Sequence, residues 1–75
     1  MTNDQILTVS LEEFGLSKYE AQAYVALISK GTISASELAY YSEVPRTKIY
    51  PTLLKLKNKK LVIISKSKPI MCTAI

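Results

Sequence analysis

The chain has 75 residues, 48% of them hydrophobic, and a formal net charge of +4 at pH 7. This length allows one small domain, and the apolar content excludes a disordered tail. No apolar run approaches the roughly 20 residues of a membrane span, and the N-terminus lacks the pattern of a signal peptide. Cys72 is the single cysteine, which excludes an internal disulfide. A cytoplasmic protein without a membrane partner is expected.

The charge is distributed unevenly along the chain. Residues 1–43 contain all six acids and two lysines, a net charge of −4, whereas residues 44–75 contain one arginine, seven lysines and no acid. Uncompensated cations in a folded segment suit a polyanion. Nucleic acid is the first candidate. An anionic membrane surface is less favoured because the basic segment lacks a bulky aromatic face.

Apolar spacing predicts two helices before the basic segment. Leu7, Leu11 and Phe14 form one stripe of a first helix over residues 3–14, which Gly15 ends. The Ser-x-x-Glu sequence of residues 17–20 is a capping box, in which the serine caps an amide and the glutamate reaches back. It opens a second helix over residues 18–30, and Gly31 ends it.

Two further helices are predicted next, within residues 34–60. Ile33 is an isolated apolar residue and a candidate short strand. A second capping box at residues 34–37 opens a helix over residues 35–42. After a short turn, Pro45 stands at a first helical position, and helical apolar spacing continues to about Lys59. Two helices joined by three or four residues make a helix-turn-helix.

The last segment, residues 61–75, changes to strand character. Residues 61–64 are apolar and largely β-branched, residues 70–74 form a second candidate strand, and the polar loop 65–69 between them holds two lysines and a proline. This pattern predicts a β-hairpin. The expected fold is therefore α+β, mainly α: one winged helix-turn-helix domain of residues 1–75, in which residues 1–14 are the N-terminal helix and residues 61–75 the wing.

Two motifs make the chain resemble the TrmB family. The stretch 15–24 has the form GLSxYEAxxY, and the stretch 44–50 has the form VPRxxxY. With the apolar positions between and after them, the resemblance covers roughly residues 11–64. It implies a mostly archaeal transcription regulator with a winged helix-turn-helix domain. Members usually carry a C-terminal effector-binding domain, but no small-molecule effector site is evident in this sequence.

Three residues depart from the family pattern. Glu43 and Lys60 stand where the family favours glycine, and a left-handed backbone there would cost each about 1 kcal/mol. The two turns are therefore expected to differ. Pro51 lies inside the basic helix, where its missing amide leaves the carbonyl of Thr47 without a partner. A kink or a broken first turn is expected.

The candidate DNA contacts come from three segments. With Ile49, Leu53 and Leu56 facing the core, the outward residues of the basic helix include Arg46, whose planar fork matches the guanine edge. The others are predicted to meet phosphates or bases. The candidate residues are Ser34, Ser36, Pro45, Arg46, Thr47, Lys48, Tyr50, Thr52, Lys55, Lys66 and Lys68. Ser34 has a competing structural role as an N-cap, and the wing lysines, Lys66 and Lys68, have one in keeping the loop solvated.

The sequence predicts a sequence-specific regulator of double-stranded DNA, associated with the nucleoid. The recognition helix would enter the major groove, and the wing would lie on the backbone or minor groove. A homodimer through the N-terminal helix is expected because Ile6, Leu7, Val9, Leu11 and Phe14 exceed one narrow stripe. A protein-docking module and a DNA-coating protein of low specificity stay open as alternatives, with single-stranded nucleic acid as a weaker third. No catalytic, metal or cofactor motif is present, so an enzyme is not expected.

Overall fold

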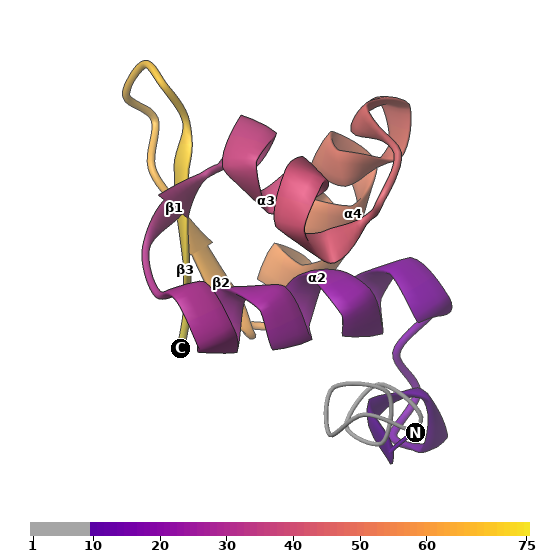
Figure 1. Cartoon of the computed structure of the whole chain (residues 1–75). Coiled ribbons are helices and arrows are strands. Elements are labelled where there is room, and N and C mark those ends of the chain that lie inside the picture. The colour runs from indigo at the N-terminus through magenta and orange to yellow at the C-terminus, as the bar shows by residue number, and fades with distance from the viewer. Residues whose placement is uncertain (1–9) are drawn as a thin grey trace.

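The computed structural model describes residues 10–75. A short helical turn over residues 10–13 is followed by α2 (Lys18–Lys30), β1 (Ile33–Ser34), α3 (Ala35–Ser42), α4 (Arg46–Asn58), β2 (Val62–Ile64) and β3 (Met71–Ala74). In Figure 1 the helices lie together on one side and the strands stand at the left, with the wing loop above them. The order of elements is the predicted one: helices, a short strand at Ile33, two further helices and a C-terminal hairpin. Most of the expected first helix lies outside the described residues.

Both predicted capping boxes are present. The Ser17 amide donates to Glu20 Oε1 at 3.2 Å, and the Glu20 amide donates to Ser17 Oγ at 3.2 Å. The corresponding pair at the start of α3, Ser34 and Glu37, has distances of 3.0 and 3.1 Å. Each box satisfies two amides that a helix start leaves without partners. These contacts explain why α2 and α3 begin at the predicted residues.

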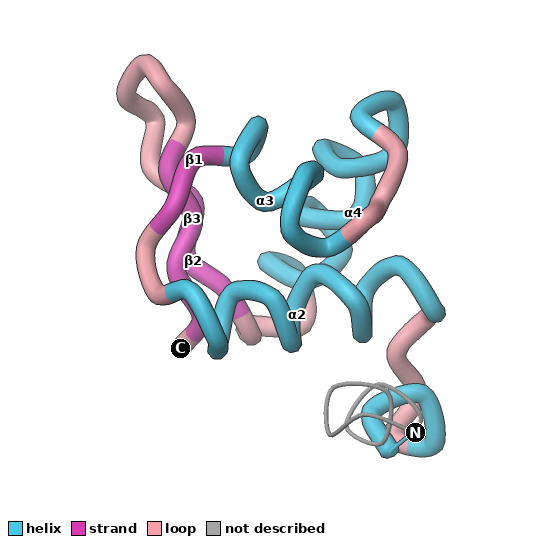
Figure 2. The backbone as a smooth tube through the Cα atoms, in the orientation of Figure 1, coloured by secondary structure: helices cyan, strands magenta, loops and turns pink. Residues whose placement is uncertain are grey.

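The sheet joins the wing to the start of the helix-turn-helix. It has three antiparallel strands in the order β1-β3-β2 (Figure 2), with Ile33 opposite Cys72 and Ile63 opposite Thr73. The candidate strand at Ile33 is therefore confirmed. The second hairpin strand begins at Met71, one residue later than expected. The Ile70 carbonyl instead accepts a hydrogen bond from the Ala35 amide at 2.9 Å, which ties the wing to α3.

The core lies between the three main helices and the sheet. Its largest fully buried side chains come from α2, α3, α4 and β3: Leu27, Leu38, Ile49, Leu53, Leu56 and Cys72. The predicted core face of α4 is thus confirmed. Burial raises the pKa of the Cys72 thiol to about 11, so this thiol stays protonated at neutral pH.

Both turns at non-glycine positions keep a left-handed backbone. Glu43 has φ 62° and directly follows α3, and Lys60 has φ 63° and follows α4. The expectation that these turns differ in conformation is wrong. The backbone accepts the strain because the adjoining helices and the strand β2 fix the chain direction on both sides.

Helix α4 is a single helix despite Pro51. The expected break in its first turn is wrong. Pro51 is exposed, so its ring displaces no packed side chain. One residue further along, the Thr52 hydroxyl donates to the Lys48 carbonyl at 2.7 Å, which adds a bond beside the one that Pro51 removes. Burial of Ile49 and Leu53 on either side holds the helix against the core.

Candidate nucleic-acid interface

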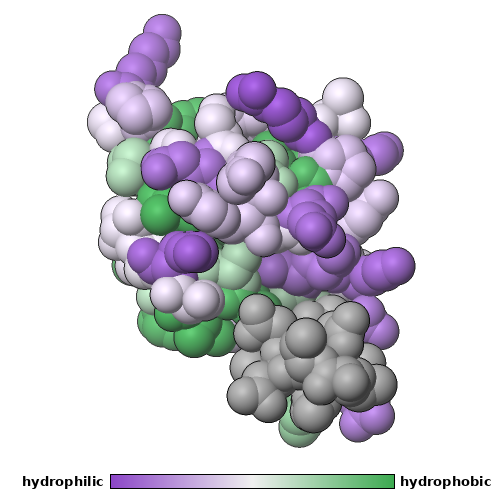
Figure 3. Space-filling model, viewed as in Figure 1, coloured by the Kyte–Doolittle hydropathy of each residue, from purple (hydrophilic) through white to green (hydrophobic). Residues whose placement is uncertain are grey.

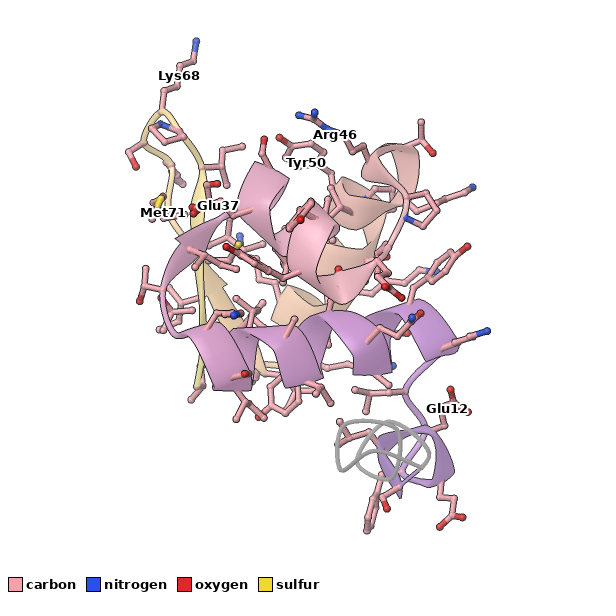
Figure 4. The ribbon with its side chains drawn as sticks, in the orientation of Figure 1. Glu12, Glu37, Arg46, Tyr50, Lys68 and Met71 are labelled. Carbon is pink, nitrogen blue, oxygen red and sulfur yellow. The ribbon has the colours of Figure 1, made fainter. Side chains whose placement is uncertain are left out.

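Three elements bring polar and basic side chains to one edge of the molecule. The start of α3, the outer side of α4 and the wing surround an open hollow lined by Ser34, Ala35, Ser36, Tyr50, Lys68, Pro69 and Ile70. Figure 4 shows Arg46 and Tyr50 at the top of the ribbon and Lys68 at the tip of the wing, on the opposite side from α2. We call this surface, together with the exposed polar residues of α4, the basic edge.

The start of α3 contributes two serines with different surroundings. The Ser34 hydroxyl accepts the Glu37 amide of the capping box, so Ser34 has the structural role that competed with DNA contact. Ser36 is exposed, and its hydroxyl accepts a hydrogen bond from an Arg46 guanidinium nitrogen at 3.2 Å. This contact joins the two helices of the helix-turn-helix at the surface and directs Arg46 toward the hollow.

Most of the candidate residues of α4 are exposed as predicted. Arg46, Thr47, Lys48 and Lys55 are exposed, and the Tyr50 side chain is 49% exposed. Pro45 is exposed and occupies the N-cap, one residue before the helix begins. A proline cannot cap through its side chain, so the first amides of α4 remain without a side-chain partner.

The prediction that Thr52 faces outward is wrong. Thr52 is 5% exposed, and its hydroxyl is already bonded to the Lys48 carbonyl. The buried side of α4 is wider than the stripe of Ile49, Leu53 and Leu56, because α2 also packs against this helix. A hydrogen-bonded hydroxyl can be buried there at little cost. Thr52 therefore does not belong to the basic edge.

The wing presents its two lysines on a loop stabilised by its own serines. The Ser65 hydroxyl accepts the Met71 amide at 2.9 Å and lies 3.0 Å from the Ser67 hydroxyl. The peptide bond between Lys68 and Pro69 is cis. Both Lys66 and Lys68 are exposed, and Lys68 extends away from the body of the domain (Figure 4). The loop backbone thus has a defined path that leaves both ammonium groups in solvent.

One lysine of the basic segment faces away from this edge. Lys59 Nζ lies 2.6 Å from a carboxylate oxygen of Glu20 and 3.2 Å from the Gly15 carbonyl. Burial alone raises the pKa of Glu20, but hydrogen bonds from Lys59 and Ser17 together outweigh it, so the pKa lies below 4.5. This ion pair closes the start of α2 against the end of α4. The pair is structural, so Lys59 does not belong to the basic edge.

Sequence reasoning missed one cation of the basic edge. Lys57 is exposed, and it stands two helical turns after Tyr50, on the same side of α4. Helical spacing counted from the buried residues would have placed it there. Glu37 lies in the first turn of α3, where hydrogen bonds from the Ser34 amide and hydroxyl lower the pKa of its carboxyl.

Residues 10–75 contain no group of three or more histidine, cysteine, aspartate or glutamate side chains that would hold a metal. None of the helices in this part of the chain has the length and apolar character needed to cross a membrane.

Solved structures share this fold. The structure of TrmBL2, described as an archaeal chromatin protein with a novel mode of DNA binding, superposes with a TM-score of 0.92 at 34% identity, over 97% of this chain and 29% of that one. A Zα domain from Carassius auratus bound to Z-DNA gives a TM-score of 0.71 at 19% identity, over 77% of this chain and 94% of its own. The second likeness supports the winged-helix fold alone.

Sequence comparison gives relatives of the same kind. The chain is 41% identical over 63 residues to the DNA-binding transcriptional repressor TrmBL2 of Thermococcus kodakarensis, which is 84% of this chain and 24% of that protein. It is 38% identical over 69 residues to the sugar-sensing transcriptional regulator TrmBL1 of Pyrococcus furiosus, 92% of this chain and 20% of that protein. The chain thus spans about a quarter or less of the length of these relatives.

A family model decides the assignment. The model described as the sugar-specific transcriptional regulator TrmB matches residues 11–75, which include both sequence motifs, α2, α3, α4 and the wing. The fold, an α+β winged helix-turn-helix, agrees with it. The chain therefore belongs to the TrmB family of transcriptional regulators.

Proposed function

We propose that this domain binds double-stranded DNA as part of a transcription regulator, with α4 in the major groove and the wing on the backbone or the minor groove. The observation that carries the proposal is the convergence of α3, α4 and the wing on the basic edge. No acid occurs among residues 44–75 to offset the cations there. The DNA-binding relatives of the same family support the proposal. It implies a binding role in the nucleoid and no catalytic step.

We propose roles for the individual residues from their positions. Arg46 is at the first turn of α4, where helix-turn-helix proteins contact base edges, and its fork matches the two acceptors of guanine. Lys48 and Lys55 lie on the side of α4 away from the wing and would meet phosphates. Tyr50 and Ser36 border the hollow and would donate to a phosphate there. Thr47 and Pro45 are exposed at the start of α4. The wing lysines, also exposed, would reach the neighbouring DNA backbone.

The proposal is tested by duplex binding across a salt series. If four lysines (Lys48, Lys55, Lys66 and Lys68) meet phosphates, the slope of log K against log salt should be roughly −4. Lys66→Ala/Lys68→Ala should weaken that slope by about 2, uniformly across sequences. Lys18→Ala is the control, since Lys18 is an exposed lysine at the first residue of α2, a helix on the opposite side of the domain from Arg46 and Lys68 (Figure 4). Binding that is absent, or equal in all these variants, would reject the proposal.

Sequence reading by Arg46 is a separate step of the test. Arg46→Ala should cost about 1–3 kcal/mol on a site selected from random duplexes, and much less on random duplex. If selection enriches no site, the domain is instead a DNA-coating module of low specificity. The similarity to an archaeal chromatin protein favours this second candidate. If no duplex binds, the remaining alternative is a module that docks on another protein.

We also propose a homodimer through the N-terminal helix. Among its described residues, Phe14 is 85% exposed and Leu11 is half-buried, so apolar surface is left uncovered there. Ile6, Leu7 and Val9 lie outside the described residues. A dimer would place two recognition helices about one turn of DNA apart. Sedimentation equilibrium of wild type and Phe14→Ser tests this, because a monomer mass at every concentration of wild type would exclude the dimer.

A further inference from the structure

The outermost face of α4 is apolar along its middle. Ile49, Leu53 and Leu56 are buried against the core, so helical geometry places Thr47, Pro51 and Leu54 on the opposite face. All three are exposed, and Leu54 is 55% exposed although it is a leucine. We call these three residues the apolar ridge. The side chains of Pro51 and Leu54 point away from the core, so they do not contribute to its packing.

Cations stand on both sides of the apolar ridge. Arg46 and Tyr50 lie on the side toward α3 and the wing, where Arg46 bonds to Ser36 and Tyr50 lines the hollow. Helical spacing puts Lys48 and Lys55 on the other side. An apolar strip with cations on both sides, Arg46 on one and Lys48 and Lys55 on the other, matches a major groove, whose floor is formed by base edges and whose walls carry phosphates. This charge arrangement identifies duplex DNA as the occupant of the face.

The ridge limits which base features can be read. Pro51 and Leu54 carry no side-chain donor or acceptor, so neither side chain can hydrogen-bond to a base edge. The only apolar group that a base pair presents in the major groove is the C5-methyl of thymine. Threonine methyl and other apolar side chains recognise it by contact. Each methyl removed from water contributes a small, additive gain.

We infer that the apolar ridge contacts thymine methyl groups, so that the domain prefers A·T-rich duplex. This inference rests on the proposed function and adds the sequence feature that the domain reads. Arg46 recognises guanine at the first turn of α4, and the ridge recognises thymine from Thr47 to Leu54. Leu54 is the principal contact because it is the longest and most flexible of the three side chains.

The test removes the methyl from the DNA and leaves the protein intact. Fluorescence anisotropy compares two duplexes of identical base-pair sequence, one with thymine and one with deoxyuridine at every A·T pair. Wild type should bind the thymine duplex about fourfold more tightly for each methyl contacted. In Leu54→Ala this ratio should fall toward one, while binding to the deoxyuridine duplex stays close to that of wild type. Ile28→Ala is the matched control, because Ile28 is 59% exposed on α2.

Each outcome gives a decision. Equal affinity of wild type for the two duplexes would overturn the inference and leave the proposed function standing. A thymine preference that Leu54→Ala retains would also overturn it, because the methyl contact would then lie elsewhere. Failure of wild type to bind either duplex at low salt would reject the proposed function and this inference with it. A preference lost in Leu54→Ala and kept in Ile28→Ala is the expected result.

Discussion

Glu43 holds a backbone conformation that suits glycine better than glutamate. Its φ of 62° at the end of α3 brings the Cβ close to a carbonyl oxygen. Replacing it by glycine relieves that strain, and part of the gain is offset by the greater freedom of glycine in the unfolded chain. We expect Glu43→Gly to raise the free energy of unfolding by about 0.5–1 kcal/mol in urea titrations.

Glu43→Ala is the control for this prediction. Alanine removes the carboxylate but keeps the Cβ at the same backbone conformation. If Glu43→Ala stabilised the domain as much as Glu43→Gly, the gain would come from the lost charge and not from the backbone.

The ion pair between Glu20 and Lys59 makes stability depend on pH. The pKa of Glu20 lies below its ordinary value of 4.5 in the folded state, so folding favours the ionised carboxylate. Its contribution is therefore fully present above the unfolded pKa and is lost as pH falls through the folded pKa. We expect the melting temperature to fall below about pH 4.5, and to fall less steeply in Glu20→Gln, which keeps the capping box.

Lysine substitutions separate the ion pair from general acid effects. We call the fall in melting temperature below about pH 4.5 the acid limb. Lys59→Met should make the acid limb less steep, as Glu20→Gln does, since it removes the hydrogen bond of 2.6 Å between Lys59 and Glu20. Lys57→Met removes a neighbouring lysine that takes no part in this pair and should leave the limb unchanged. An identical acid limb in wild type, Glu20→Gln and Lys59→Met would contradict the assignment.

At the scale of elements, Pro51 lowers the stability of α4 but contributes to the apolar ridge that contacts DNA. It removes one amide from the interior of α4, and an interior proline costs a helix about 3 kcal/mol. The helix nevertheless continues from Arg46 to Asn58. We expect Pro51→Ala to stabilise the domain by about 1–3 kcal/mol in urea titrations. We also expect it to weaken the preference for thymine, because the variant shortens the apolar ridge.

The control for Pro51→Ala lies one turn earlier on the same face. Thr47→Ala measures what alanine gains from helix propensity alone, since Thr47 is also exposed on α4. A gain in Thr47→Ala equal to that in Pro51→Ala would show that the missing amide costs nothing in this helix.

The elements that sequence predicts well are those with local signals. The two capping boxes define the starts of α2 and α3 because each is complete within four residues. The missed features depend on tertiary contacts. Thr52 is buried on a helix that packs against α2, α3 and β2, and Ile70 leaves the strand because its carbonyl bonds to α3. α4 continues through Pro51 because its neighbours are anchored in the core.

The candidate site was predictable to the extent that helical geometry determines it. Arg46, Thr47, Lys48 and Lys55 are exposed because Ile49, Leu53 and Leu56 face inward, which the spacing alone indicates. The hydrogen bond between Arg46 and Ser36 was not predictable, since it depends on the angle between two helices. Leu54 was missed because exposed leucine carries no polar signal, although the same spacing places it outward.

At the scale of the molecule, surface character divides the domain. In the space-filling view, strongly hydrophilic side chains lie along the upper and right-hand edges, and apolar surface is exposed at the lower left (Figure 3). The acidic Glu12 lies at the opposite end from Arg46 and Lys68 (Figure 4). A domain with this distribution would be steered toward a polyanion with its basic edge first.

The most direct test of this account maps the interface on the folded domain. Backbone amide shifts recorded while a duplex is added should change at the start of α3, along the outer face of α4 from Arg46 to Lys55, and in the wing around Lys66 and Lys68. The amides of α2 should move little, because that helix lies on the other side. Shifts concentrated on α2, with the basic edge unchanged, would contradict the account.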